Sequence, residues 1–148
     1  MPGSFTSLHY HIVFSTRDRR PVIAPDLRPR LWGYMGGILR DQGNTPLAIG
    51  GTAEHVHVLA GLTPTRALAD VMRELKAGSS RWVHEALGER GFAWQEGYAA
   101  FTADFGSLDR ARAYIARQEQ HHREVTFQEE YRVFLDRHGI AYGERYLW

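Results

Sequence analysis

Four short segments of the chain have the hydrophobic pattern of β-strands. In residues 8–16 every second side chain is apolar, which predicts a half-buried strand. Residues 46–52 and 54–62 are short apolar runs joined by a tight connection, and they predict two further strands. The aromatic-rich segment 92–104 predicts a fourth strand.

Four longer segments carry hydrophobic residues at helical spacing. We expect helices over residues 26–42, 64–87, 107–125 and 127–138. Asp26 is the expected N-terminal cap of the first of them.

The order β-α-β-β-α-β followed by two helices predicts an α+β, ferredoxin-like sandwich. Such a fold has a four-stranded antiparallel sheet with both long helices on one face and leaves the other face open. We expect one domain over residues 1–148, because no repeat or interdomain linker interrupts the chain. Its expected parts are a core over 8–104, a helix over 107–125, and a last helix with an aromatic tail over 127–148.

Composition narrows the class of protein. The 148 residues are 43% hydrophobic and 24% charged, which is typical of a globular protein. The net charge of +1 does not by itself indicate a nucleic-acid partner. Cysteine is absent, which excludes disulfides and thiolate metal sites. We see no secretory signal and no apolar run near the ~20 residues of a membrane helix, so we expect a soluble cytoplasmic protein without a membrane partner.

Two histidines one residue apart interrupt the apolar run of residues 54–62. Because alternate residues of a strand share a face, His55 and His57 point away from the aliphatic set that includes Val56 and Val58. Neighbouring imidazoles on the open face of a sheet can bind one metal ion. The alternative is a pair of half-exposed histidines that only form hydrogen bonds, and an isolated His-x-His favours it because a metal site needs a third ligand.

The helix expected over 107–125 offers a third ligand and a nucleophile. Tyr114 and Gln118 are four residues apart and therefore lie on one helical face. An amide oxygen from Gln118 with two imidazoles suits Mn²⁺ or Mg²⁺, with zinc left open. Tyr114 beside a metal-bound phosphate can attack phosphorus and form a covalent intermediate. Taken alone, this pattern favours an amphipathic helix in which Tyr114 is packed as an ordinary aromatic.

Several stretches together resemble the small HUH-type, single-tyrosine transposases of bacterial insertion sequences and the related REP-associated tyrosine transposases. The stretches that carry the resemblance are HYHIVFSTRDRRP, GGTAEHVHVLAGL, ELKAGSSRWV, FAWQEGYAAFTAD, YIARQEQHHREVTFQEEY and GIAYGERYLW. The resemblance implies that His55 and His57 bind a divalent metal, that Gln118 completes the metal site and that Tyr114 is the nucleophile.

The same resemblance implies the reaction and the partners. Members of this family cleave and rejoin single-stranded DNA at hairpin-containing ends through a 5′-phosphotyrosine intermediate. The resemblance also implies a homodimer in which each active site combines the histidines of one subunit with the tyrosine helix of the other.

Other candidates depend on weaker signals. His122 follows Gln118 at helical spacing and Glu54 precedes His55, so both are expected partners around the metal site, although a capping role at a helix end is the simpler interpretation of His121 and His122. His9 and His11 are expected to be structural. The expected DNA contacts are Arg17, Arg19, Arg20, Arg73, Lys76, Ser79, Ser80 and Arg81.

Two other functions remain open at this stage. One is a domesticated hairpin-DNA-binding protein that keeps the site but does not cleave, which a covalent-adduct assay distinguishes from the enzyme. The other is a small metallohydrolase that uses His55, His57 and Gln118 with metal-bound water, and it predicts turnover without a protein–DNA adduct.

Overall fold

A computed structural model describes residues 3–147 of the chain, so Trp148 at the end of the expected aromatic tail lies outside the described residues. Within this range no helix combines the length and the apolar character needed to cross a membrane. The main elements are β1 (His9–Ser15), α1 (Arg28–Asp41), β2 (Thr45–Gly51), β3 (His55–Gly61), α2 (Leu68–Leu87), β4 (Ala99–Ala103), α3 (Leu108–Ala116), α4 (Gln118–His121) and α5 (Phe127–Arg137).

The strands form one four-stranded sheet in the order β2-β3-β1-β4. Each neighbouring pair is antiparallel, and β3 lies in the interior of the sheet, where His57 is paired with Val13 of β1 and with Gly50 of β2. This order and these directions confirm the predicted ferredoxin-like fold.

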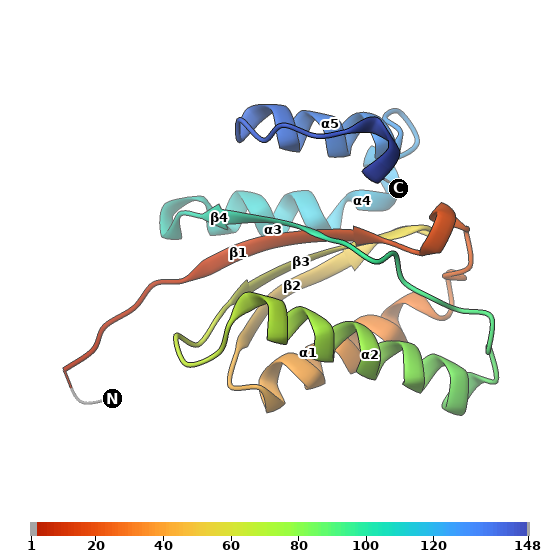
Figure 1. Ribbon diagram of the computed structural model, residues 1–148, viewed down its shortest axis with the longest axis horizontal. Coiled ribbons are helices and arrows are strands. Elements are labelled where there is room, and N and C mark those ends of the chain that lie inside the picture. The colour runs from red at the N-terminus through yellow and green to blue at the C-terminus, as the bar shows by residue number, and fades with distance from the viewer. Residues whose placement is uncertain (1–2, 148) are drawn as a thin grey trace.

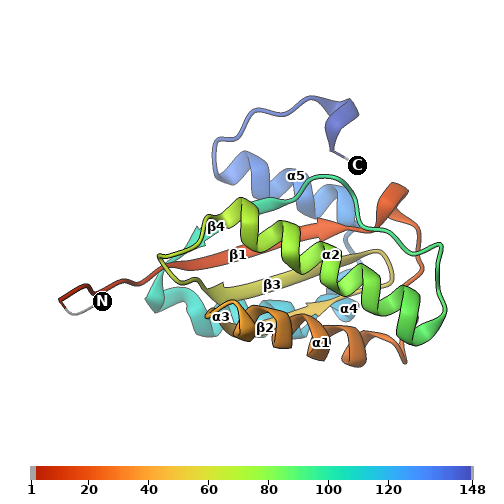
Figure 2. The ribbon, with the colours of Figure 1, turned by 60° about the horizontal axis from the view of Figure 1, so that its bottom comes forward.

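Helices α1 and α2 lie together on one face of the sheet (Figure 2). Apolar side chains from both helices and from alternate positions of β1 and β3 form the main hydrophobic core there. Its fully buried members include Ile12, Phe14, Leu31, Met35, Leu39, Val56, Val58, Val71 and Leu75. The placement of Val56 and Val58 in this core confirms which face of β3 is the aliphatic one.

The opposite face of the sheet is covered by α3, α4 and α5 (Figure 1). The expectation of an open face is therefore wrong. The reason is that α3 and α5 each carry an apolar stripe that packs on this side of the sheet, where Val13, Leu59 and Phe101 point. The buried residues of these two stripes are Leu108 and Ile115 on α3, and Phe127, Tyr131 and Leu135 on α5.

Three expected boundaries differ from the structure. The strand expected over 92–104 is limited to β4, because the preceding segment crosses the sheet edge as a loop that buries Phe92 and Trp94 in the main core. The helix expected over 107–125 breaks at Arg117, where φ is −103° and ψ is 18°. Asp26 does not cap α1, whose N-cap position is Leu27.

Candidate metal centre beside Tyr114

The two histidines of β3 are directed toward the layer formed by α3, α4 and α5. His55 and His57 have no exposed surface, although the sequence places them on a face of the sheet that is expected to be open. They are buried among polar groups and aromatic rings of that layer. The Phe127 ring stacks on His55 with 4.3 Å between ring centroids, and the Tyr114 ring lies 5.8 Å from that of His57.

Tyr114 and Gln118 reach the histidines from either side of the break at Arg117. The Gln118 side chain is buried, and its Oε1 lies 3.1 Å from Nε2 of His55. Tyr114 is partly buried on α3. The structure thus brings the expected nucleophile, the expected amide ligand and the histidine pair together within a single chain.

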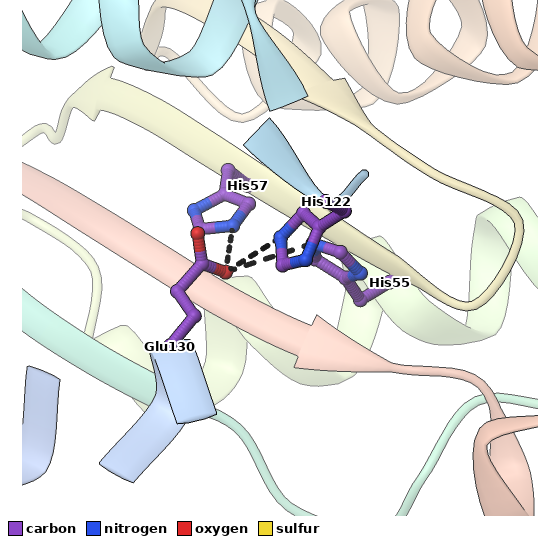
Figure 3. A group of neighbouring side chains, drawn as sticks. All are labelled: His55, His57, His122 and Glu130. Atoms are coloured by element: carbon purple, nitrogen blue, oxygen red, sulfur yellow. Dashed lines mark hydrogen bonds and ion pairs between the residues drawn. The ribbon is translucent and has the colours of Figure 1, made fainter. Parts of the chain in front are cut away.

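Two residues that were not predicted as ligands complete the cluster (Figure 3). Oε1 of Glu130, from α5, lies 2.9 Å from Nε2 of His57, 3.2 Å from Nε2 of His122 and 3.7 Å from Nε2 of His55. One potential ligand atom from each of these four residues lies within 4.8 Å of the other three. His122 is the C-cap residue of α4, but its ring faces the cluster, so a capping role alone does not describe it.

Each imidazole is held through the nitrogen that faces away from the cluster. Nδ1 of His55 lies 2.9 Å from the hydroxyl of Thr52, and Nδ1 of His57 lies 2.8 Å from Nε2 of His11. Nδ1 of His122 lies 2.7 Å from the carbonyl oxygen of Val125. Because a carbonyl oxygen only accepts, Nδ1 of His122 carries the hydrogen. Partners of this kind fix the ring orientation and leave Nε2 available as a ligand.

The donor set fits a cation. In the neutral ring, Nε2 of His122 has only a lone pair, yet it faces Oε1 of Gln118 at 2.9 Å and Oε1 of Glu130 at 3.2 Å. The Glu130 carboxylate is itself 4% exposed, and a buried carboxylate needs a compensating positive charge. A proton on His122 or a metal ion among these atoms supplies that charge. His55, His57, His122 and Glu130 can therefore bind a metal, with Gln118 beside them.

The same contacts set the protonation of the cluster. Burial, reinforced by the nearby His57, lowers the pKa of His11 to about 3, and burial likewise lowers the pKa of His55 well below its usual value. Burial alone would raise the pKa of Glu130, but its close contacts with His122 and His57 outweigh burial and hold that pKa well below its usual range. The imidazoles of His11 and His55 are thus neutral and the carboxylate is ionised at neutral pH.

Tyr114 is held by the second oxygen of the same carboxylate. Its hydroxyl donates to Oε2 of Glu130 and lies 3.3 Å from Nε2 of His121. Burial, and then the hydrogen bond to Glu130 and its charge, raise the pKa of Tyr114 well above its usual value. One carboxylate therefore contacts both the imidazoles that could hold a metal and the candidate nucleophile.

Two hollows reach this cluster from outside. One, of about 390 Å³, is lined by His122, Thr52, Glu54 and Arg28, and burial raises the pKa of Glu54 there. The other, of about 980 Å³, is lined by Tyr114, Glu130 and His11 together with residues of α3, α5 and β4. Glu54 and His122 therefore line the same hollow, although Glu54 is not one of the four residues of the cluster.

Most of the expected DNA contacts lie far from Tyr114. Arg17, Arg19 and Arg20 occupy the turn after β1, whereas Arg73, Lys76, Ser79, Ser80 and Arg81 belong to α2 on the opposite face of the sheet.

Two of the α2 residues have structural contacts instead. Ser79 has no exposed surface and accepts a hydrogen bond of 2.9 Å from Nε1 of Trp94, so the expected DNA contact of Ser79 is wrong. Lys76 donates to the carbonyl oxygens of Gln95 and Gly97, which ties down the loop before β4.

Two residues that contact His57 were missed or misjudged from the sequence. His11 was expected to be structural but contacts His57 directly. For Glu130 a signal exists: it shares a helical stripe with Phe127, Tyr131 and Phe134, and a carboxylate on an apolar stripe indicates a buried partner.

Comparisons with known proteins agree with this architecture. A family model described as IS200-like transposase matches residues 4–118, a span that contains the histidine pair, Tyr114 and Gln118 and ends before His122 and Glu130. The ISDra2 transposase TnpA of Deinococcus radiodurans is 26% identical over 128 residues, which cover 82% of this chain and 90% of that protein.

Solved structures share the fold. A crystal structure of a transposase-like protein from Deinococcus radiodurans superposes with a TM-score of 0.66 at 24% identity, covering 80% of this chain and 95% of that one. A REP-associated tyrosine transposase bound to a REP hairpin superposes with a TM-score of 0.61 at 17% identity, covering 84% of this chain and 74% of that one.

Proposed function

The chain belongs to the IS200-like transposase family, and from that premise we propose that it cleaves and rejoins single-stranded DNA through a covalent bond to Tyr114. The observation that carries this proposal is the position of the Tyr114 hydroxyl. It donates to a carboxylate whose other oxygen lies 2.9 Å from the metal-binding imidazole of His57, and it borders a hollow large enough for a nucleotide strand.

The proposed reaction is a pair of transesterifications. The Tyr114 oxygen forms a bond to the scissile phosphorus, the bond from phosphorus to the 3′-oxygen breaks, and that oxygen leaves as a 3′-hydroxyl after taking up a proton. The 5′-phosphate remains on the tyrosine. A 3′-hydroxyl from another strand then displaces the phenol, which regains a proton. Each step exchanges one phosphoester bond for another, so no ATP is required.

The chain's own residues orient and restrain the nucleophile. Glu130 accepts a hydrogen bond from the Tyr114 hydroxyl and so directs it toward the cluster. Burial and this hydrogen bond raise the pKa of Tyr114, which keeps the hydroxyl protonated in the protein without DNA or metal. His11, Thr52 and the Val125 carbonyl hold the three imidazoles so that each Nε2 points inward. The site is therefore preorganised before DNA binds.

A divalent metal is the proposed cofactor. We assign it to His55, His57 and Gln118, as the family resemblance implies, together with His122 and Glu130. When bound, the ion supplies Lewis-acid chemistry that polarises the phosphate and lowers the cost of a phenolate. Between the two expected ions we favour Mn²⁺ over Mg²⁺, because three imidazoles suit a softer ion than the oxygen ligands that Mg²⁺ prefers.

The proposed substrate is a DNA hairpin with a flanking single strand. The superposition with a transposase bound to a REP hairpin supports a partner of this kind. Specificity for the hairpin then comes from shape and from unpaired bases read together.

Replacing Tyr114 tests the proposal directly. Tyr114→Phe keeps the ring and its packing and removes only the hydroxyl, so hairpin DNA and Mn²⁺ should bind nearly as in the wild type. The covalent protein–DNA band on a denaturing gel should disappear. Tyr142→Phe and Tyr131→Phe are the matched controls and should keep the band. A band that persists in Tyr114→Phe would move the nucleophile elsewhere, and a wild type that never forms it would favour a non-cleaving DNA-binding protein.

Subunit mixing tests how the active site is assembled. A homodimer with shared sites predicts that His57→Ala and Tyr114→Phe proteins, each inactive, regain activity when mixed and allowed to exchange. The proximity of Tyr114 to His57 within one chain, 5.8 Å between ring centroids, supports sites that need only one subunit. If each site is built within one chain, the mixed proteins should not recover adduct formation. Mass-tagged subunits show independently that the subunits have exchanged.

A further inference from the structure

The larger hollow beside Tyr114 lies between α3, α5 and the end of β4, on the opposite side of the sheet from α1 and α2. We propose that this hollow, called here the arginine groove, binds the single-stranded DNA segment that leads to the scissile phosphate. The inference rests on the proposed function, because it names where the substrate strand of that same site lies. The arginine groove has a volume of about 980 Å³, which is at the upper end of ordinary ligand pockets, as an extended polymer segment requires.

The charge of the groove fits a phosphate backbone. Arg110 and Arg117 from α3 and its end, and Arg137 from α5, line it and are exposed. Among residues 3–147 none of the arginine–carboxylate ion pairs involves these three side chains. The lining also holds two carboxylates, Asp104 and Glu130, and the Glu130 carboxylate contacts His57, His122 and Tyr114 within the cluster. Three available guanidinium groups around one groove form a surface that attracts successive phosphates.

One wall of the groove is aromatic. Phe101 stacks with Phe134, at 5.3 Å between ring centroids, and with His138, at 4.3 Å. Phe134 is partly buried and His138 is exposed, so both present ring surface to the hollow. Proteins that bind single strands without strict sequence preference combine a basic groove with rings on which bases stack. The wall thus provides the second component of such a site.

The position of the tyrosine explains the preference for a single strand. The Tyr114 hydroxyl points inward to the buried carboxylate of Glu130, so a phosphate must enter the groove to approach it. A flexible strand with unpaired bases can follow the groove and bring one phosphate to this depth. A regular duplex keeps its phosphates on the outside of a stiff cylinder and is held off by the flanking helices.

The test removes the groove charges without changing side-chain length greatly. The groove variant combines Arg110→Gln, Arg117→Gln and Arg137→Gln, and the control variant combines Arg90→Gln, Arg112→Gln and Arg123→Gln. The control removes the same charge from exposed positions that do not line the groove. The probe is a fluorescent single-stranded oligothymidylate, whose binding is followed by anisotropy over a range of salt concentrations.

The groove variant should bind the probe at least about tenfold more weakly near 0.15 M salt. The slope of the logarithm of the binding constant against the logarithm of the salt concentration should become shallower by about 2, the value for three lost single-strand phosphate contacts. The control variant should match the wild type in both quantities. At subsaturating hairpin DNA the groove variant should form less covalent adduct than the wild type, whereas the control variant should form as much. Equal affinity and equal slope in groove variant and control would overturn the groove assignment even if the adduct forms. A wild type that binds through the groove without forming an adduct would contradict the proposed reaction and leave the groove in place.

Discussion

His122 shows how one backbone contact can define a ligand. Its Nδ1 donates to the carbonyl oxygen of Val125, so its Nε2 is the atom presented to Gln118 and Glu130. The neighbouring His121 has its Nε2 near the Tyr114 hydroxyl instead. Two adjacent histidines at the end of one short helix thus have different environments, and of these two only His122 belongs to the group that could hold a metal.

This difference predicts the outcome of removing each ring. His122→Ala should weaken Mn²⁺ binding by at least the roughly 10–100-fold typical of lost partners around a metal site, because an inward-facing Nε2 is removed. His121→Ala should leave Mn²⁺ affinity nearly unchanged. Isothermal titration with Mn²⁺ measures both. Equal losses in the two variants, or none in either, would remove His122 from the ligand set.

At the scale of elements, the site depends on how α3 lies against β2. Gly50 of β2 faces α3, and a Cβ atom added there would come 2.6 Å from the carbonyl oxygen of Ile115. This close approach is possible only without a side chain, and it sets the distance between the helix that carries Tyr114 and the strand next to the histidines.

Gly50→Ala should therefore push α3 away from the sheet. We expect a loss of about 1–3 kcal/mol in the free energy of unfolding, as for overpacked sites, and weaker adduct formation because Tyr114 moves with α3. Gly33→Ala is the control: the position is in α1 with no atom within 4 Å of an added Cβ, so stability should rise by up to about 1 kcal/mol. Urea denaturation measures the free energy of unfolding of both variants. A Gly50→Ala protein as stable as the wild type would show that α3 can adjust its position.

At the scale of the whole molecule, buried neutral histidines make stability depend on pH. The pKa of His11 falls from 6.5 in the unfolded chain to about 3 in the folded one, chiefly through burial, and burial lowers that of His55 in the same direction. The unfolded chain therefore binds more protons below pH 6.5. By linkage, stability falls as the pH drops from about 6.5 toward about 3.

The free energy of unfolding should decrease by about 1.4 kcal/mol per pH unit for each such histidine as the pH falls. Urea denaturation of the metal-free protein between about pH 6.5 and 5, above the usual carboxyl range, isolates this contribution. His11→Gln should make the slope shallower by one histidine's share, and His9→Gln, at a partly buried position of the same strand, is the matched control. A slope unaffected by His11→Gln would show that His11 is protonated in the folded protein.

The sequence by itself determined the features that depend on local periodicity. Alternation along β3 placed His55 and His57 on the face away from Val56 and Val58, because a strand has a period of two whatever packs against it. Helical spacing placed Tyr114 near Gln118 in the same way. The order of the strands and helices indicated the ferredoxin-like topology, and the family motifs indicated the transposase.

Only the tertiary structure decided what covers those histidines and what completes their cluster. Glu130 is 73 residues from His57 in the sequence, and His11 is 46 residues from it, so no local pattern relates them. His11 lies beside His57 because β1 pairs with β3, and Glu130 reaches His57 because α5 buries its apolar stripe on the sheet face that the strand pattern alone left open. The periodicity of a segment shows which side chains share a face, but the partner of that face depends on which other apolar surface in the chain must be removed from water.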